Sequence, residues 1–528
     1  MQRAWFCPAL LAAAAVAAVL ATIDPTGVCL HSASGPGITA DEGFNTEHGV
    51  YLADRLLNAD LPGFCEACGA LPDHPPLGRV WIGLCHEFAL LVWPPTGHSA
   101  TFYTIAAARL GPALAFGGLV WLIGWSASVW YGRGAGCASA AALVLMPHLF
   151  GHAHLAALET PLNFTWCAAL LFIAHRWSGE RPPNWRTAFG GGVLWGLALL
   201  TKIQAVFLPI PIAIWAIIFW RKQALPALIV WGTAGLVAFY VGWPWLWAAP
   251  FERGLGYFAH ATVRATVNVW YMASVIADQH VPWHYPWVMF LTAAPVGLHL
   301  LGVGGVCGGR PAWKSPREAL LLAALVWPLI VFSLPCVAVY DSDRLFLFVF
   351  PLWALFIGRG VAAAICRLQP WLSARQAGLL VAVLFLLQGW GTISTAPCQL
   401  SYYNLLVGGL RGANRLGLAT TYWGDSLTRD MLVSTARFAP AGSVVQVLPD
   451  LHRFQTRELM QQTPVLRERK ILLLAFDRGR AITGPRYLLM FMRREYLPPD
   501  FREPPAGARE LAAVRREGVL LAALYQLP

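Results

Sequence analysis

The chain has 528 residues, of which 57% are hydrophobic and only 12% are charged, with a net charge of +11. Soluble domains carry about 25% charged residues, so this composition excludes a soluble enzyme, a disordered chain and a coiled coil. A protein that binds nucleic acid is excluded as well, and a polytopic membrane protein remains.

Apolar stretches long enough to cross a bilayer recur from the N-terminus to about residue 395. We predict about eleven spans, in a membrane domain of residues 1–396. They are Ala4–Ile23, Phe102–Trp125, Gly136–Phe150, Leu155–His175, Ala188–Thr201, Ala205–Trp220, Leu225–Trp247, Trp287–Val306, Ala319–Val339, Leu345–Ile365 and Gln376–Ser394. The fifth and sixth are short, but keeping them separate places 13 of the 20 basic residues of this domain on the cytoplasmic side, as the positive-inside rule requires.

The first span has an alternative interpretation as a cleaved signal peptide, because Val19-Leu20-Ala21 resembles a cleavage site. Its apolar run of about 18 residues exceeds the usual length of about 7–15, which favours a retained span. In either case the following loop, residues 24–101, is outside. We therefore predict a multi-pass protein of the cell (inner) membrane.

The acidic residues are distributed more unequally between the two sides of the membrane than the basic residues are. In this topology 14 of the 16 acidic residues of the membrane domain lie on the outer side, and only Glu180 and Glu318 lie inside. Acidic residues contribute little to topology, so insertion does not explain the bias. Chemistry on the outer side is one explanation for a face so rich in carboxylates.

Two acidic motifs stand in the first outer loop. Asp41-Glu42 precedes a helical pattern of apolar residues from Phe44 to Leu56, which predicts an amphipathic helix on the membrane surface. Asp73-His74 precedes two prolines, which hold a rigid extended turn. Both motifs also have an explanation that involves no function. Acidic residues are favoured at the N-terminus of a helix, which would account for Asp41-Glu42, and the prolines after Asp73-His74 would simply separate two elements.

Two ionisable residues stand at the outer ends of apolar segments. Glu159 begins or lies within an apolar helix, where a charged group is costly and is a functional candidate by default. Lys202 is the only lysine on the outer side of the membrane domain, between two short predicted helices. A buried anionic partner explains its position better than snorkelling to the interface.

Further polar residues follow in the later outer loops. The loop after the seventh span, rich in Trp and Tyr, contains His260 and Arg264, and the next outer loop contains Asp341 and Asp343. Arg344 begins the tenth helix, from where its guanidinium could reach a phosphate as a fork of donors.

Beyond the last span the composition becomes charged and rich in arginine, with 18 basic and 11 acidic residues. Alternating runs predict strands at Ser443–Leu448 and Tyr487–Met492, and amphipathic runs predict helices at Arg429–Phe438 and Thr456–Gln462. Residues 397–528 are therefore expected to form a small extracytoplasmic α/β domain.

The order of these motifs resembles the polyprenyl-phosphate-dependent glycosyltransferases with the GT-C fold. The similarity is greatest to the family 39 group, which includes protein O-mannosyltransferases and the bacterial aminoarabinose transferase acting on lipid A. It covers roughly Asp24–Gly360, with the closest stretches at Asp41-Glu42, Ala106–Ala115, Glu159-Thr-Pro-Leu and Thr201-Lys202. The resemblance implies an all-α polytopic membrane protein of GT-C type, carrying the C-terminal α/β domain.

The resemblance also implies roles for single residues. Asp41 matches the acidic base of the family, and Glu159 matches its second acid, which is usually Asp. Lys202 matches the lysine of a Leu-Thr-Lys motif, and Arg344 matches the arginine of an Arg-Tyr-Leu-like motif, with Leu345 in the place of Tyr.

Other positions depart further from the family pattern. Asp73-His74 stands where some relatives have Glu-Lys, so His74 replaces a lysine that would contact phosphate. His260 and Arg264 fall where relatives often place His and Arg. A divalent metal ion between Asp73 and His260 is implied, because a similar pair binds metal in relatives.

These matches lead to a mechanistic hypothesis. A sugar that leaves a polyprenyl phosphate needs a base for the acceptor hydroxyl and positive charge on the departing phosphate. We expect Asp41 to be the base, with Glu42 positioning the acceptor and Glu159 as the second acid. Single displacement would invert the anomeric centre.

The expected partners are a polyprenyl-phosphate-linked sugar donor, a lipid, protein or glycan acceptor, and membrane lipid. The phosphate is expected to contact Lys202 and Arg344, assisted by His74 and Arg264. The alternative is a flippase or transporter of lipid-linked sugars, for which paired halves with broken helices at the bilayer midplane would be typical.

Overall fold

The computed structural model describes residues 5–27, 32–94, 103–179, 182–260, 265–308, 311–479 and 484–528, and only the backbone of His260 and Ala374. The described chain is mostly helical, with a small sheet region near its C-terminus, as the sequence predicts.

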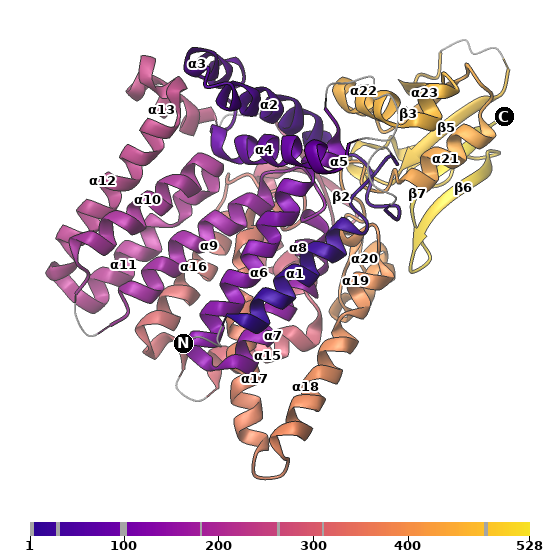
Figure 1. Cartoon of the computed structure of the whole chain (residues 1–528). Coiled ribbons are helices and arrows are strands. Elements are labelled where there is room, and N and C mark those ends of the chain that lie inside the picture. Colours follow the sequence, from indigo (N-terminus) through magenta and orange to yellow (C-terminus); the bar gives the residue numbers. More distant parts are fainter. Residues whose placement is uncertain are drawn as a thin grey trace.

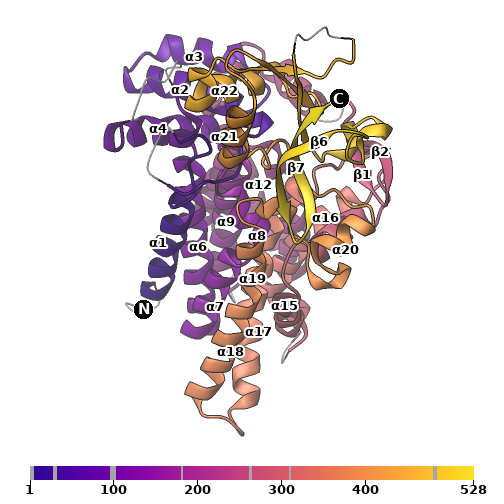
Figure 2. The same cartoon turned by 90° about the vertical axis from the view of Figure 1, so that its right-hand side faces the viewer.

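A bundle of roughly parallel helices forms the body of the molecule (Figures 1 and 2). It contains α1 (Phe6–Leu20), α5 (Ile105–Ala108), α6 (Leu110–Tyr131), α7 (Arg133–Val144), α8 (Pro147–His152), α9 (Glu159–Arg176), α10 (Trp185–Thr201), α11 (Pro209–Trp220), α12 (Leu225–Gly242), α14 (Tyr285–Thr292), α15 (Val296–Cys307), α16 (Pro316–Phe332), α17 (Phe350–Leu368), α18 (Ala374–Gln388) and α19 (Trp390–Ser394). At least one helix overlaps each predicted span range.

Fewer of these segments than predicted are long and apolar enough to cross a membrane by themselves. Within the described ranges, four qualify, or five if a pair bent by 109° counts as one span. The four are Ile105–Tyr131, Ile203–Gly242, Arg344–Leu368 and Arg375–Ser394. Several other helices are shorter than a bilayer crossing needs, such as α7 with 12 residues and α1 with 15. Eleven spans therefore stay a prediction.

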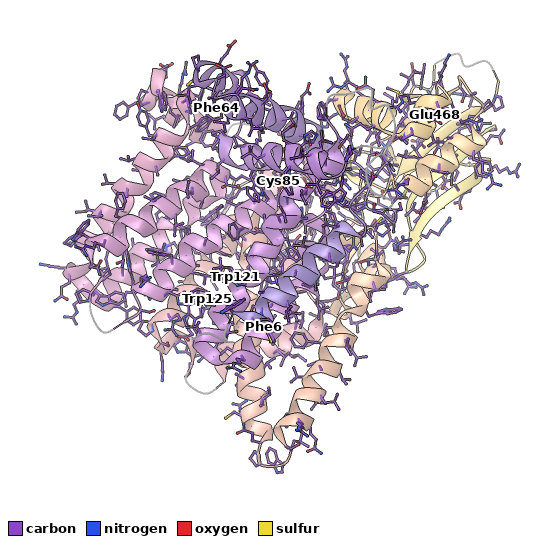
Figure 3. The ribbon with its side chains drawn as sticks, viewed as in Figure 1. Phe6, Phe64, Cys85, Trp121, Trp125 and Glu468 are labelled. Atoms are coloured by element: carbon purple, nitrogen blue, oxygen red, sulfur yellow. The ribbon has the colours of Figure 1, made fainter. Side chains whose placement is uncertain are left out.

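The outer surface of the bundle exposes large apolar side chains, as a lipid-facing surface requires. Figure 3 shows Phe6, Trp121 and Trp125 on the lower part of this surface. Phe6 is 55% exposed and Trp121 is 40% exposed. Exposed aromatic side chains of this kind fit a surface that contacts lipid.

A second layer of helices crosses the upper end of the bundle (Figure 1). It contains α2 (Ala40–Leu57), α3 (Leu61–Ala70), α4 (Pro76–Val92) and α13 (Pro250–His260), and a short hairpin of β1 (Asn268–Tyr271) and β2 (Ser274–Ala277) follows α13 in the chain. The amphipathic helix predicted from Phe44 to Leu56 is confirmed as α2.

Glycines set the distance between α2 and α4. A Cβ added to Gly83 would lie 1.9 Å from the carbonyl oxygen of Gly49, and one added to Gly49 would lie 2.6 Å from that of Arg79. Only glycine allows the two backbones to approach this closely. The contact sets the distance between the middle parts of the two helices.

The C-terminal domain is built on a five-stranded sheet in the order β4-β3-β5-β7-β6, with β3 parallel to β4 and β5 and the other pairs antiparallel. The strands are β3 (Val444–Leu448), β4 (Leu472–Ala475), β5 (Arg486–Phe491), β6 (Arg509–Arg516) and β7 (Val519–Leu527); the helices are α20 (Gly409–Arg415), α21 (Arg429–Phe438), α22 (Arg453–Gln462) and α23 (Pro464–Glu468). The structure confirms the two strands and two helices predicted here.

The domain packs against the first outer loop through buried polar contacts. The Gln455 amide donates to the carbonyl oxygen of Ile38 at 2.9 Å, and the Tyr103 hydroxyl donates to Glu458 at 2.8 Å. These contacts place the C-terminal domain beside the first turn of α2, at the same end of the bundle.

Candidate active site

A cavity of about 1290 Å³ lies where the upper helices, the ends of the bundle helices and the C-terminal domain meet. Six of the nine residues predicted for the site line it: Asp41, Asp73, His74, Glu159, Lys202 and Arg344. Because these residues come from five separate segments, their convergence is a property of the fold and not of any one motif.

Helix ends place four of these side chains. Asp41 lies in the first turn of α2, and Glu159 is the first residue of α9. Lys202 caps α10 in an extended conformation, where the helix stops before a short 3-10 helix. Arg344 begins another 3-10 helix, η6 (Arg344–Val349), that leads into α17.

The Arg344 guanidinium joins three carboxylates. Its Nε donates to Oε1 of Glu159 at 2.6 Å, its Nη1 donates to Oδ2 of Asp341 at 3.2 Å, and its Nη2 donates to Oδ2 of Asp41. The arginine side chain is 10% exposed, whereas that of Asp41 is 46% exposed. Asp41 is therefore the most accessible of the three carboxylates around this guanidinium.

Glu159 also binds Lys202. It is the buried anionic partner that the position of Lys202 predicts. The Lys202 Nζ donates to Oε1 of Glu159 at 2.6 Å, and both residues are buried. Oε2 of Glu159 is buried without a hydrogen-bond partner among the described residues. One carboxylate oxygen thus accepts hydrogen bonds from two cations, and both cations have further donors that an anionic ligand could contact.

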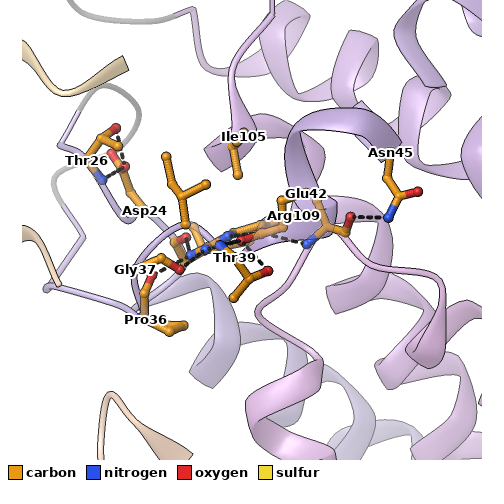
Figure 4. A network of polar contacts seen from close by, with 12 residues as sticks. Asp24, Thr26, Pro36, Gly37, Thr39, Glu42, Asn45, Ile105 and Arg109 are labelled. Atoms are coloured by element: carbon orange, nitrogen blue, oxygen red, sulfur yellow. Dashed lines mark hydrogen bonds and ion pairs between the residues drawn. The ribbon is translucent and has the colours of Figure 1, made fainter. Parts of the chain in front are cut away.

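Glu42 follows Asp41 directly, but it belongs to a separate network of polar contacts with Arg109 (Figure 4). Arg109 contacts both oxygens of Glu42, at 2.7 Å and 2.9 Å, and the backbone amides of Thr39 and Ala156 donate to them at 2.7 Å and 2.8 Å. Glu42 is fully buried and is not among the described residues that line the cavity. The predicted role in positioning the acceptor stays a prediction, and the contacts favour a structural role.

Replacing Glu42 with Gln is expected to lower the free energy of unfolding by about 3–5 kcal/mol, because Arg109 would remain buried without its counter-charge. Thermal unfolding of the detergent-solubilised protein measures this. Glu47→Gln is the matched control, since Glu47 pairs with Arg457 at 3.1 Å in an exposed position and should contribute less than about 1 kcal/mol. Equal melting temperatures for the two variants would contradict the structural role.

Asp73 and His74 lie on the wall of the cavity near α4. Both oxygens of Asp73 accept from Arg79, at 2.7 Å and 2.8 Å. Burial raises the pKa of Asp73, but the contacts with Arg79 outweigh burial and keep the pKa below its ordinary value. Burial lowers the pKa of His74 to about 4, so this side chain is neutral at pH 7 and offers a phosphate no positive charge.

The metal site predicted at Asp73 and His260 stays a prediction, because the side chain of His260 is not among the described residues. Within the described ranges, no group of three or more His, Cys, Asp or Glu side chains lies close enough together to hold a metal ion. Arg79 already occupies both oxygens of Asp73, and its positive charge opposes a cation. The whole of Arg264 also lies outside the described residues, so its predicted role stays a prediction.

Three residues that line the cavity were not assigned a role from the sequence. Asp341 accepts from Arg344 and, on its other oxygen, from Arg493 at 2.7 Å. Asn45 accepts from Nε of Arg79 at 3.2 Å. Tyr257 is 6% exposed, and its hydroxyl is buried without a partner among the described residues. Of these three residues, only Asp341 belongs to a motif noted in the sequence, Asp341-x-Asp343.

The two ends of the cavity differ in character. At one end the lining is apolar and aromatic, with Val206, Phe207, Phe332 and Leu345, and the rings of Phe207 and Phe332 lie 5.3 Å apart. The other end carries further aromatic residues from α2 and the C-terminal domain: Phe44, Trp423 and His452. The charged cluster lies between an apolar region and the C-terminal domain.

Asp425, just beyond Trp423 in the chain, provides a pH-dependent test of this region. Burial raises the pKa of its carboxyl to about 6, and one of its oxygens has no partner among the described residues. Its contribution to stability is complete below the unfolded-state pKa of about 3.9 and is lost as the pH rises through about 6, a loss of about 2–3 kcal/mol. Asp425→Asn should remove this dependence, which melting temperatures measured from pH 4 to 7.5 would reveal as a flatter slope.

The fold and the cavity define a helical membrane protein with a buried cluster of carboxylates and cations beside an apolar pocket. Residues 100–247, which include Glu159 and Lys202, match the family described as dolichyl-phosphate-mannose-protein mannosyltransferase. This match confirms the predicted resemblance to that group of membrane glycosyltransferases. A comparison with curated proteins gives no match.

Several solved structures are similar over most of the chain. ArnT from Cupriavidus metallidurans in the apo state is 15% identical, with 98% of this chain and 97% of that chain covered and a TM-score of 0.48. The same protein bound to undecaprenyl phosphate is 14% identical, with the same coverage and a TM-score of 0.47. The oligosaccharyltransferase AglB from Archaeoglobus fulgidus, in complex with an inhibitory peptide and a dolichol-phosphate, is 11% identical, with 93% and 70% covered and a TM-score of 0.48.

Proposed function

We propose that the chain transfers a sugar from a polyprenyl-phosphate donor to an acceptor hydroxyl on the extracytoplasmic side of the membrane, with inversion at the anomeric carbon. The observation that carries this proposal is the convergence of Asp41, Glu159, Lys202 and Arg344 on one cavity with an apolar end. An isoprenoid chain suits the apolar end, while the phosphate suits the two cations.

In the proposed step the acceptor oxygen attacks the anomeric carbon while the bond from that carbon to the phosphate oxygen breaks. The acceptor proton passes to Asp41, and polyprenyl phosphate leaves with the bonding electrons. The departing phosphate is already a stable anion, so the step needs positive charge near it more than a strong acid. Lys202 and Arg344 supply that charge.

The contacts of Arg344 support an exchange of partners when the donor binds. One nitrogen of the guanidinium contacts Asp41, the most exposed carboxylate of the cluster. A phosphate that accepts from this nitrogen would compete with Asp41. The carboxylate would then be free to accept the acceptor proton, so donor binding would activate the base.

Arg79 and Asp73 form part of the same wall, near the hydroxyl of Tyr257. The Tyr257 hydroxyl, which has no hydrogen-bond partner among the described residues, can donate to a sugar hydroxyl or a phosphate oxygen, which supports a polar ligand in this region. The acceptor is proposed to approach from the side of Phe44 and Trp423, since the opposite end is apolar.

A flippase of lipid-linked sugars is the competing proposal. It would favour charges near the bilayer midplane between paired halves. The charged residues here stand at the ends of bundle helices beneath α2 and beside the C-terminal domain, which supports chemistry at the membrane surface.

Inversion provides a direct test of the proposed chemistry. Purified protein incubated with a labelled β-configured polyprenyl-phosphate sugar and total membranes should yield an α-linked product, read by NMR coupling constants of the isolated glycoside. A product that retains the donor configuration would contradict single displacement with Asp41 as base.

A further inference from the structure

The C-terminal domain contributes a buried arginine to the edge of the charged cluster. Arg493 follows β5, the central strand of the five-stranded sheet, and Met492 continues the strand pairing through a backbone bond to Leu521. The Arg493 side chain is 2% exposed, and its Nη2 donates to Oδ1 of Asp341 at 2.7 Å. A rigid strand therefore holds this guanidinium against a loop of the membrane domain.

Further contacts fix the orientation of Arg493. The guanidinium carbon lies 3.6 Å from the ring centroid of Trp423, which lines the cavity, and Nε lies 2.9 Å from Glu495. Planar stacking and two carboxylate partners leave the side chain little freedom. Its position is thus determined by the C-terminal domain and not by a ligand.

Asp341 connects Arg493 to the centre of the site. One of its oxygens accepts from Arg493 and the other accepts from Nη1 of Arg344. Burial raises the pKa of Asp341, but the two arginines outweigh burial and keep the carboxyl ionised. Without Arg493, Asp341 would be a buried carboxylate paired with Arg344 alone among the described residues.

Arg493 adds positive charge to the edge of the cluster, although it shares that charge between Asp341 and Glu495. Asp41, Glu159 and Asp341 face Lys202 and Arg344, so without Arg493 three carboxylates would stand against two cations. A cluster with excess negative charge would repel an anionic phosphate.

We propose that Arg493 is a positioning residue: it neutralises Asp341 and thereby leaves the Arg344 guanidinium free to bind the phosphate of the donor. This inference rests on the proposed function. It assigns the C-terminal domain a part in donor binding, through a contact between residues 152 positions apart in the sequence.

The test measures the binding of a radiolabelled polyprenyl monophosphate, which needs neither sugar nor acceptor. The full-length variants are Arg493→Gln, Arg493→Lys, Asp341→Asn and the double variant Arg493→Gln/Asp341→Asn. Arg494→Gln is the control, because this neighbouring arginine packs over Trp270 instead of contacting the cluster. Melting temperatures are recorded for every variant.

Arg493→Gln should weaken binding about tenfold, and the double variant should bind more tightly than Arg493→Gln because the uncompensated carboxylate is gone. Arg493→Lys should recover part of the loss, and Arg494→Gln should bind as the natural chain does. In transfer assays Arg493→Gln should raise KM for the donor more than it lowers kcat.

Wild-type affinity in Arg493→Gln would overturn the proposal. So would a double variant that melts normally yet binds no better than the single variant. If Arg493→Gln does not fold, Arg493→Lys replaces it in the test. Adding Asp341→Asn to Arg493→Lys must then restore part of the affinity for polyprenyl phosphate that Arg493→Lys loses. Absence of polyprenyl phosphate binding by the natural chain would instead refute the proposed function itself, and this inference with it.

Discussion

Replacing Asp41 with Asn should lower the rate of sugar transfer by about 10²–10⁴-fold, because a positioned general base contributes about that much to a proton-transfer step. The amide keeps the shape of the side chain and cannot accept the acceptor proton. Asp41 is 46% exposed, so loss of its contact with Arg344 should change stability little. Donor binding should be retained, because the variant removes a competitor for Arg344.

The measurement is the initial rate of transfer at saturating donor, together with the affinity for polyprenyl phosphate. Asp54→Asn is the matched control, since this exposed aspartate lies on the same helix and contacts only Asn58 in the described chain. Transfer by Asp41→Asn at the rate of Asp54→Asn would exclude Asp41 as the base.

Replacing Lys202 with Met should weaken donor binding by roughly ten- to a hundredfold. Hydrogen bonds to charged groups contribute about 1.5–3 kcal/mol, and each 1.4 kcal/mol is a factor of ten in affinity. Lys202 is 6% exposed and contacts Glu159 at 2.6 Å. Without Lys202, Glu159 would pair with Arg344 alone and hold that guanidinium more tightly. The variant would therefore weaken the contact of the phosphate with both cations.

Titration with a labelled polyprenyl phosphate measures this effect, and Lys222→Met is the control because Lys222 is exposed in a short helix between α11 and α12. The double variant Lys202→Met/Glu159→Gln should recover folding stability but not phosphate affinity. Unchanged affinity in Lys202→Met would remove this lysine from the proposed phosphate site.

Charge scarcity was the most informative signal in the sequence. In a chain with 12% charged residues, each ionisable residue at the end of an apolar segment was a candidate. Six of the nine site residues predicted from the sequence, including three from the first outer loop, line one cavity. Helices α2 and α21 and strand β3 were predictable because amphipathic and alternating patterns are local properties.

Contacts between distant segments were not predictable from one sequence. Asp41 and Glu42 are neighbours, but only the packing of Arg109 reveals that Glu42 is buried in a separate ion pair. The contact between Asp341 and Arg493 depends on how the sheet sits against the bundle. The number of spans stays a prediction for a related reason, since hydropathy does not reveal where an apolar stretch is broken into shorter helices.

The most direct test of the account is the release of free polyprenyl phosphate by purified protein in liposomes that contain a labelled polyprenyl-phosphate sugar and an acceptor extract. We expect the amount of free polyprenyl phosphate released to equal the amount of labelled sugar found on the acceptor. Both signals should be lost in Asp41→Asn. Movement of intact donor between the leaflets, with no release of polyprenyl phosphate by the natural chain, would contradict the account.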